Sequence, residues 1–355
     1  MGEPVPISSS PPGPSERLVG LVLGDKWNVV ERIRLDDGIT GASRSACYRA
    51  TSRSGDVAFV KAFDFRRTER EGNTELLESM VREFNYEKTV HYYCVEQGVS
   101  RVTRIYDAGN VTVDGETVHF IICEWANKCL RESQPPGDSE TPLSDRLFAV
   151  RDIASALAQL HQAGVAHQDA KPSNAMCPSV GAVKLADLGS SSCERIDAPP
   201  HDAHSLVGQP NYAPYELLYE QPPTSWRRRR FGCDLFLLGN LCFTSLIGGS
   251  LSFLALHAIP AGMRPAEFTG NYSEVLPYLL EAHELIIPAA INERVAGSIA
   301  KDLISTVAAL CHPDPTKRGH PKNVLFGSHQ FGLERFISRF DVLANRMRAA
   351  DSGKR

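Results

Sequence analysis

The sequence predicts an α+β fold with two lobes, in which a small antiparallel sheet with one helix comes first and a larger, mainly helical part follows. Short apolar stretches typical of strands fall in the first 125 residues, at 27–34, 46–50, 57–63, 102–113 and 117–123. Apolar residues spaced three and four apart, which are typical of helices, dominate after Ser144. The length of 355 residues accommodates two domains or one two-lobed domain.

The composition is that of a globular protein with a sizeable core, because 42% of the residues are apolar and 23% are charged. The formal net charge of −4 provides no global field that would indicate a nucleic acid partner. Nine cysteines are scattered without a C-x-x-C pair or the spacing of metal ligands. They predict free thiols in a reducing compartment, so we expect a cytoplasmic protein, and no signal peptide pattern is visible.

The beginning of the chain is rich in proline and serine, and residues 1–20 are predicted to be disordered. The first lobe is predicted to comprise residues 21–125. Its first two strands flank a polar turn that contains Gly38 and Gly41. Its third strand carries Lys61 as the single charge of an apolar run, and a buried lysine needs an anionic partner.

The only helix of the first lobe is predicted at residues 75–96, and it carries Glu83 and Glu87 one turn apart. The two strands that follow are separated by a turn at Asp114 and Gly115, a pair typical of hairpins.

The second lobe is predicted over residues 126–330. Its first long helix starts at Ser144 and ends at Gly164. Residues 235–260 contain no Asp, Glu, Lys or Arg, and about 20 apolar residues can span a bilayer. Polar and glycine positions interrupt the stretch, so we favour a buried core helix that ends near Gly248, with a membrane span as the alternative.

The end of the chain is predicted to form a separate element, a basic amphipathic helix and tail over residues 331–355. Its aromatic and aliphatic residues alternate with arginines. Such a helix packs on its own domain or docks on a partner helix or a membrane surface.

Chemistry concentrates in residues 167–174, which read His-Gln-Asp-Ala-Lys-Pro-Ser-Asn. The Asp169 carboxylate can accept a proton from an attacking hydroxyl, Lys171 can hold a phosphate oxygen, and Asn174 can ligate a hard cation. A short apolar stretch further on ends in Asp187, which supplies a second carboxylate. One carboxylate for a nucleophile and another, with an amide, for a metal ion are the parts that phosphoryl transfer needs.

These stretches resemble the H-R-D-x-K-P-x-N loop and the D-F-G motif of eukaryotic-type protein kinases. The resemblance covers about residues 27–322 and implies a bilobal kinase fold. It implies catalytic roles for Asp169 and Lys171, and metal binding by Asn174 and Asp187. His167 would support the loop.

The resemblance also implies a set of ATP-binding positions. Lys61 would grip the phosphates, with Glu87 as its partner and Glu83 as the rival for that role. The remaining positions are the backbones of Glu124 and Ala126 beside adenine and the divergent phosphate-covering turn with Gly38 and Gly41.

Two further residues match a buried ionic pair of the family, Glu216 and Arg318 in the D-P-x-x-R turn, and Asp234 matches the aspartate that supports the catalytic loop. The chain departs from the family at Gln168, which replaces an arginine, and at Gln209, which replaces a threonine expected to orient Asp169. The run of four arginines at 227–230 is interpreted as a solvated face, with an acidic-substrate or phosphate site as the alternative.

The sequence therefore predicts a Ser/Thr protein kinase that uses ATP and Mg²⁺ and acts on protein substrates. Because Gln168 cannot pair with a phosphate, alanine at Ser190, Ser191, Ser192 and Ser205 is expected to leave turnover largely intact. The alternatives are a pseudokinase that serves as a binding module and, with less support, a small-molecule phosphotransferase.

Overall fold

The computed structural model describes residues 13–33, 45–63, 65, 74–135, 138, 140–178, 180–326 and 329–352. Gly38 and Gly41, the predicted phosphate-covering glycines, lie outside the described residues. The chain forms two compact units, one of residues 1–81 and 104–125 and the other of residues 82–103 and 126–355. Residues 82–103, which the sequence analysis assigns to the first lobe, cluster with the second unit.

The first unit is built on a six-stranded antiparallel sheet, as the sequence predicts. The strands run in the order β1-β2-β3-β4-β6-β5. Their bounds are β1 Val22–Leu23, β2 Trp27–Ile33, β3 Ser45–Ser52, β4 Val57–Phe63, β5 Ile105–Val113 and β6 Glu116–Glu124. Tyr48, Val60 and Ile122 from three neighbouring strands are fully buried, so the sheet has one apolar face that forms a core of its own.

Part of the N-terminal segment that the sequence predicts to be disordered is ordered. Pro14–Glu16 form a 3₁₀ turn, η1, and Leu18 is completely buried in the core of the sheet. The Tyr48 hydroxyl donates a hydrogen bond of 2.5 Å to the Ser15 carbonyl oxygen. The prolines exclude a regular helix or strand, but they do not prevent tertiary contacts from fixing residues 13–20.

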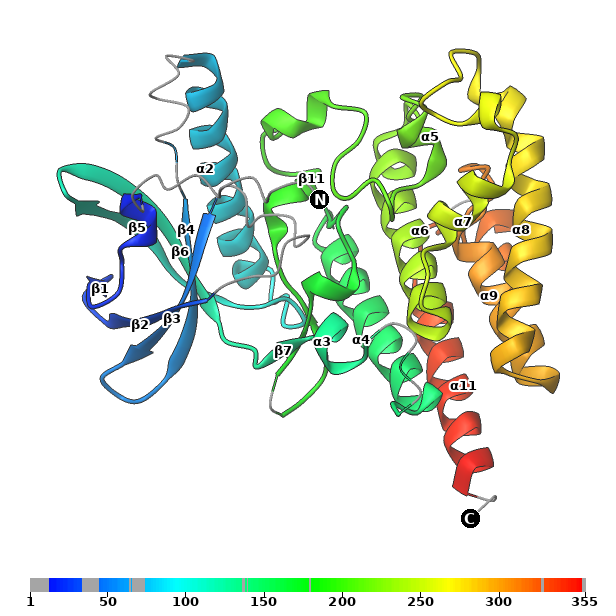
Figure 1. Ribbon diagram of the computed structural model, residues 1–355, viewed down its shortest axis with the longest axis horizontal. Helices are drawn as coiled ribbons and strands as arrows, with labels where there is room; N and C mark the ends of the chain where they lie inside the picture. Colours follow the sequence, from blue (N-terminus) through cyan, green and yellow to red (C-terminus); the bar gives the residue numbers. More distant parts are fainter. Residues whose placement is uncertain are drawn as a thin grey trace, which may run out of the picture. The chain divides into compact units, whose positions relative to one another are not determined.

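Helix α2 (Thr74–Glu96) begins in the first unit and continues in the second. The rest of the second unit is mainly helical (Figure 1). Its helices are α3 Leu130–Ser133, α4 Leu143–Gln162, α5 Tyr215–Leu218, α6 Trp226–Ile247, α7 Leu251–Ala258, α8 Tyr272–Arg294, α9 Gly297–Leu310, α10 Pro321–Phe326 and α11 Glu334–Ser352. Its 3₁₀ turns are η2 Pro172–Asn174, η3 Leu188–Ser190, η4 Pro200–Ala203 and η5 Ala261–Met263.

Two small sheets complete the second unit and hold the segment that the sequence singles out. Strands β10 (Lys184–Leu185), β9 (Ala175–Cys177) and β7 (Lys128–Cys129) form one of them, and β11 (Ser192–Cys193) pairs with β8 (Val165–Ala166) in the other. Residues 167–174 therefore lie between β8 and β9, with both ends of the loop anchored in antiparallel pairs.

Helix α6 forms the centre of the second unit, between α4 and α9 (Figure 1). It ends at Gly248, whose positive φ of 97° closes the helix in the left-handed conformation, as the sequence predicts. Among the described residues it is the one helix long and apolar enough to cross a membrane, but 94% of its most apolar window is buried inside the protein. In this structure α6 is a core helix.

The C-terminal helix α11 lies along α4 (Figure 1). Its apolar side chains, among them Phe336, Phe340 and Leu343, belong to the core of the second unit. Arg339 and Arg346 on its polar side both pair with Asp302 of α9, at 2.7 and 2.9 Å. The helix thus packs on its own unit with both its apolar and its basic side chains.

Candidate active site

The backbone of the loop of residues 167–174 is hydrogen-bonded to Asp234 of the central helix α6. The fully buried Asp234 carboxylate accepts hydrogen bonds from the backbone N–H groups of His167 at 2.9 Å and Gln168 at 2.7 Å. It also lies 2.8 Å from Nε2 of His161. Gln168 has a positive φ of 63°, so the backbone turns sharply just before Asp169. A rigid helix therefore fixes the loop at the residue that precedes the candidate base.

Asp169 is oriented by three donors. Lys171 Nζ lies 2.6 Å and Asn174 Nδ2 2.9 Å from its Oδ2 atom, and the backbone N–H of Gln209 donates to Oδ1 at 3.2 Å. Burial raises the pKa of the Asp169 carboxyl, and the nearby Asp187 carboxylate adds to that rise, while Lys171 opposes it. The arrangement presents an oriented carboxylate with an increased affinity for a proton.

The replacement of threonine by Gln209 predicts an Asp169 that is less firmly oriented, unless the amide side chain of Gln209 reaches it. The backbone N–H makes the contact instead, and the preceding Gly208 permits it. Gly208 has φ of 81°, and a Cβ atom there would lie 2.6 Å from the Gln168 carbonyl oxygen. Only glycine allows the two segments to approach so closely.

Asp187 lies beside this loop, at the point where β10 ends. It has a left-handed φ of 64°, and the preceding residue is bonded to the loop through its backbone. The Ala186 N–H donates to the Asn174 carbonyl oxygen at 2.9 Å, and His167 Nε2 lies 3.1 Å from the Ala186 carbonyl oxygen. A Cβ atom on Gly189 would lie 3.1 Å from Glu87 Oε2 and 3.3 Å from Asp187 Oδ1. The second unit therefore brings Glu87 of α2 next to Asp187.

The donor set around Asp187 fits a metal ion that is shared with a phosphate ligand. The Asn174 amide nitrogen donates to the Asp169 carbonyl and carboxylate oxygens, both at 2.9 Å, which leaves its own carbonyl oxygen on the opposite side of the amide. No cluster of three or more His, Cys, Asp or Glu side chains suited to a metal ion occurs among the described residues. One carboxylate and one amide oxygen suit Mg²⁺, which usually completes its coordination with water and substrate phosphates.

The predicted adenine and phosphate positions are divided between the two units. Lys61 lies in β4 opposite Cys47 and Ile121, and its ammonium nitrogen is 5.2 Å from the centre of the Phe63 ring. Glu124 ends β6 and accepts a hydrogen bond from Arg104 N–H at 3.2 Å. Both residues belong to the first unit, whereas Ala126 and Glu87 belong to the second.

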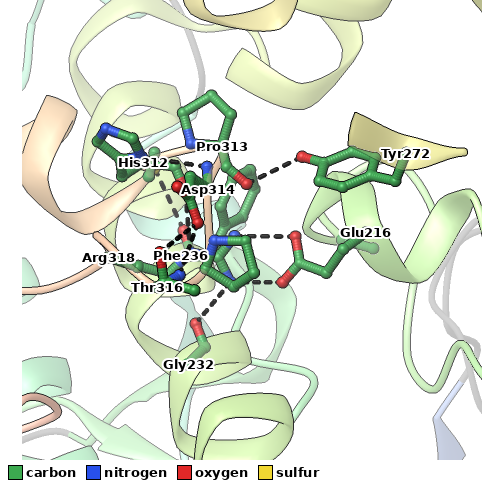
Figure 2. Close-up of polar contacts among 12 residues, drawn as sticks. Glu216, Gly232, Phe236, Tyr272, His312, Pro313, Asp314, Thr316 and Arg318 are labelled. Atoms are coloured by element: carbon green, nitrogen blue, oxygen red, sulfur yellow. Dashed lines mark hydrogen bonds and ion pairs between the residues drawn. The ribbon is translucent and has the colours of Figure 1, made fainter. Parts of the chain in front are cut away.

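A buried ion pair lies in the same unit as the loop. Arg318 donates two hydrogen bonds to the Glu216 carboxylate, at 2.6 and 2.9 Å, and both side chains are almost fully buried. Figure 2 shows Arg318 between Glu216 and the Gly232 carbonyl oxygen, which accepts a third bond at 3.2 Å. The structure thus contains the ionic contact expected from the two separated motifs.

A family model described as protein kinase domain matches residues 40–329 of this chain. The chain belongs to the protein kinase family. The antiparallel sheet of the first unit and the mostly helical second unit are the two parts of the bilobal kinase fold.

Individual relatives of this kinase are distant, and they match over limited stretches. MAP kinase-interacting serine/threonine-protein kinase 2 of Xenopus laevis is 36% identical over 111 residues, which cover 28% of this chain and 23% of the relative. 3-phosphoinositide-dependent protein kinase 1 of Arabidopsis thaliana is 31% identical over 147 residues, covering 38% and 28%. Aurora kinase of Dictyostelium discoideum is 26% identical over 220 residues, covering 58% and 48%. This kinase thus spans between about a quarter and a half of the length of these relatives.

The arginine run of this kinase differs from its interpretation as a solvated face. Arg230 is buried: it lies 2.5 Å from Gln168 Oε1 and 2.7 Å from Asp202 Oδ1. Arg229 donates to the His204 carbonyl oxygen at 2.5 Å, and Arg227 makes two contacts with Glu194, at 2.8 and 3.0 Å. Three of the four arginines therefore bind the segment that follows the Asp187 motif. Composition alone could not reveal this, because a charge run gives no sign of which member is buried.

Two residues of that segment were missed by the sequence reasoning, His201 and Asp202. His201 Nδ1 lies 2.8 Å from Glu83 Oε2, and its Nε2 lies 2.9 Å from the Ser191 carbonyl oxygen. Glu83, which the sequence offers as an alternative to Glu87 for the partner of Lys61, therefore contacts His201 within the second unit. No local signal marks these two positions, because they lie in a polar stretch without periodicity.

Proposed function

We propose that this kinase transfers the γ-phosphoryl group of ATP to Ser or Thr hydroxyls of protein substrates in a Mg²⁺-dependent reaction. The observation that supports it most is the convergence of Asp169, Lys171, Asn174 and Asp187 in one unit, with Asp169 held by three donors. The name of one of the relatives reported above, MAP kinase-interacting serine/threonine-protein kinase 2, favours hydroxyl substrates of this kind.

Each residue has a proposed task. Asp169 orients the substrate hydroxyl and accepts its proton, and Lys171, which contacts the same carboxylate, balances the charge that develops on the transferred group. Asn174 and Asp187 would hold Mg²⁺, which neutralises phosphate charge when it is bound. Lys61, Glu87 and the backbones of Glu124 and Ala126 would bind ATP, with the turn that contains Gly38 and Gly41.

We further propose that activity does not require phosphorylation of the segment after Asp187. Gln168 provides no charge for a phosphate, and its amide is already bonded to Ser190 O at 2.8 Å and Ser192 Oγ at 2.7 Å. The Ser191 and Ser192 side chains are fully buried, so neither hydroxyl is accessible to another kinase. Alanine at the more accessible Ser190 and Ser205 is expected to leave turnover within about twofold, since surface positions of this kind contribute little.

One transfer assay distinguishes the candidate functions. Purified protein with ATP and Mg²⁺ is offered a mixed peptide array and a panel of metabolites, with Asp169→Asn as the control. Transfer to peptides or to itself, lost in the control, supports the proposal. Nucleotide binding without transfer indicates a pseudokinase scaffold, and turnover only with a metabolite indicates a small-molecule phosphotransferase.

Two properties outside the active site are also proposals. We propose that the kinase works in the cytoplasm, and the scattered cysteines of the sequence, which lack a C-x-x-C pair or the spacing of metal ligands, agree with a reducing compartment. Microscopy of a tagged protein tests this directly. We also propose that α11 is an integral part of the kinase domain rather than a docking helix for a partner, because most of its large apolar side chains, among them Phe336, Phe340 and Leu343, are already buried.

A further inference from the structure

Two neighbouring residues of η4, His201 and Asp202, join the segment after Asp187 to other elements of the second unit. Each nitrogen of the His201 ring faces an oxygen acceptor: Glu83 of α2 at 2.8 Å and the Ser191 carbonyl at 2.9 Å. Both contacts are satisfied together when the ring carries both of its N–H groups. The Tyr86 ring of the same helix also meets His201 edge-on, at 5.9 Å between ring centres. His201 thus ties α2 to this segment.

Asp202 makes the second connection. Its Oδ1 atom accepts a hydrogen bond from Ser192 Oγ at 2.5 Å and lies 2.7 Å from Arg230 of α6. Arg230 in turn donates a hydrogen bond to Gln168 Oε1 at 2.5 Å. The Gln168 amide nitrogen donates to Ser192 Oγ at 2.7 Å. Four side chains therefore close a ring that joins α6, β11, η4 and the residue before Asp169.

The charges and burial of this ring favour a single arrangement. Arg230 is almost completely buried, and burial lowers the pKa of its guanidinium while Asp202 opposes that shift. A buried cation requires a partner, so the segment cannot leave Arg230 without a large free-energy cost. The Gln168 amide uses both its oxygen and its nitrogen within the ring, which fixes the backbone that carries Asp169.

We propose that His201 and Asp202 are positioning residues, which hold α2 and the catalytic loop in place through Glu83, Arg230 and Gln168. The carboxylate of Asp202 is a permanent negative charge of the chain itself, so this arrangement needs no added phosphate. The inference rests on the proposed kinase function and specifies how its catalytic loop is kept in order. A displacement of about 1 Å at a reacting group can lower a rate about 100-fold, so loss of the ring is expected to act on kcat.

The test uses the full chain and a peptide substrate identified with the wild-type protein. Asp202→Asn keeps the shape of the side chain and removes its charge, Asp202→Glu keeps the charge, and Glu83→Gln weakens the connection to His201. Arg227→Ala is the matched control, because Arg227 belongs to the same arginine run and contacts the same segment but not this ring. For each protein we would measure kcat, KM for ATP and the melting temperature.

We expect Asp202→Asn to lower kcat at least tenfold with KM for ATP within about twofold of wild type, because only the positioning of the loop is lost. Asp202→Glu restores most of kcat, Glu83→Gln lowers it to a smaller extent, and Arg227→Ala matches wild type. If Asp202→Asn melts well below wild type, the double variant Asp202→Asn/Arg230→Gln, which removes the unpaired cation, provides a folded protein for the same comparison.

The inference is overturned if a folded Asp202→Asn or double variant turns over as fast as wild type. It is also overturned if Asp202→Glu recovers the melting temperature but not kcat, since the charge would then have only a structural role. A wild-type protein that transfers no phosphate would refute the proposed function instead, so the two failures are distinguishable.

Discussion

At the residue scale, side chains of the catalytic loop converge on Asp169. Asn174 donates to Asp169 at two atoms and is also the proposed metal ligand. Lys171 contacts the Asp169 carboxylate while it is almost fully buried. The loop is therefore a preorganised set of groups, which is what electrostatic catalysis requires.

Replacement of Asn174 by Ala tests this double role. It removes both donations to Asp169 and the amide oxygen proposed to bind Mg²⁺, so we expect kcat to fall by about 100-fold or more. The neighbouring Ser173→Ala serves as the control and should change kcat by less than about twofold. Steady-state kinetics at saturating ATP measure both, and equal activity of the two variants would show that Asn174 has no catalytic task.

The Glu216–Arg318 pair allows a second prediction at this scale. Arg318→Met leaves the buried Glu216 carboxylate without its partner, so we expect the free energy of unfolding to fall by about 3–5 kcal/mol. Arg227→Met breaks an ion pair in which 63% of the arginine side chain is exposed, and it should cost less than about 1 kcal/mol. Urea denaturation compares the two, and similar small losses would mean that the buried pair does not stabilise the fold.

At the scale of elements, α8 is joined to α5 by a buried contact between side chains. The Tyr215 hydroxyl lies 2.7 Å from His283 Nε2, and the other ring nitrogen has no hydrogen-bond partner among the described residues. Burial lowers the pKa of His283 to about 3, and the neighbouring His312 and Arg318 contribute to the shift. The helix interface therefore requires a neutral imidazole.

This contact makes stability depend on pH. In the unfolded chain His283 takes up a proton near its ordinary pKa of 6.5, whereas in the folded protein it does so only near 3. The contribution of His283 to the free energy of unfolding is therefore fully present above about pH 6.5. It decreases as the pH is lowered from about 6.5 towards 3, by up to about 1.4 kcal/mol per pH unit. Urea denaturation at pH 7, 6 and 5 should show a shallower pH dependence for His283→Gln than for wild type. Parallel profiles would contradict the assignment.

The packing of α11 gives a further prediction at this scale. Phe340 is fully buried against the second unit, so Phe340→Ala should lower the free energy of unfolding by about 3–5 kcal/mol. Val342 lies on the same helix but is 52% exposed, and Val342→Ala should change the free energy of unfolding by less than about 0.5 kcal/mol. If both substitutions are neutral, α11 does not contribute to the core and becomes available for a partner.

The elements and the loop show what can be predicted from sequence here. The strands, the end of α6 at Gly248 and the residues that surround Asp169 follow from periodicity and motif spacing, because those signals are local. The roles of Arg230, His201 and Asp202 do not, because each depends on burial and on partners far away along the chain. The ordering of residues 13–20 was missed for the same reason, since Leu18 is fixed by the sheet and not by its neighbours.

At the scale of the whole molecule, the chain belongs to the protein kinase family, and the loop of residues 167–174 in its second unit is bonded to α6, which also contacts the segment after Asp187. Asp234 holds the loop from one side, and Arg230, one turn earlier on the same helix, holds Gln168 and Asp202. These contacts involve only groups of the protein itself. We therefore propose that the protein is active as a kinase without an activating phosphate.

The initial rate of γ-phosphoryl transfer by protein whose intact mass shows no phosphate tests this claim most directly. The protein would be treated with phosphatase, separated from it, and mixed with ATP, Mg²⁺ and a substrate peptide. We predict linear transfer from the first time point, without a lag, and a rate reduced at least about 100-fold by Asp169→Asn. An unphosphorylated protein that transfers nothing until another kinase modifies it would contradict the account.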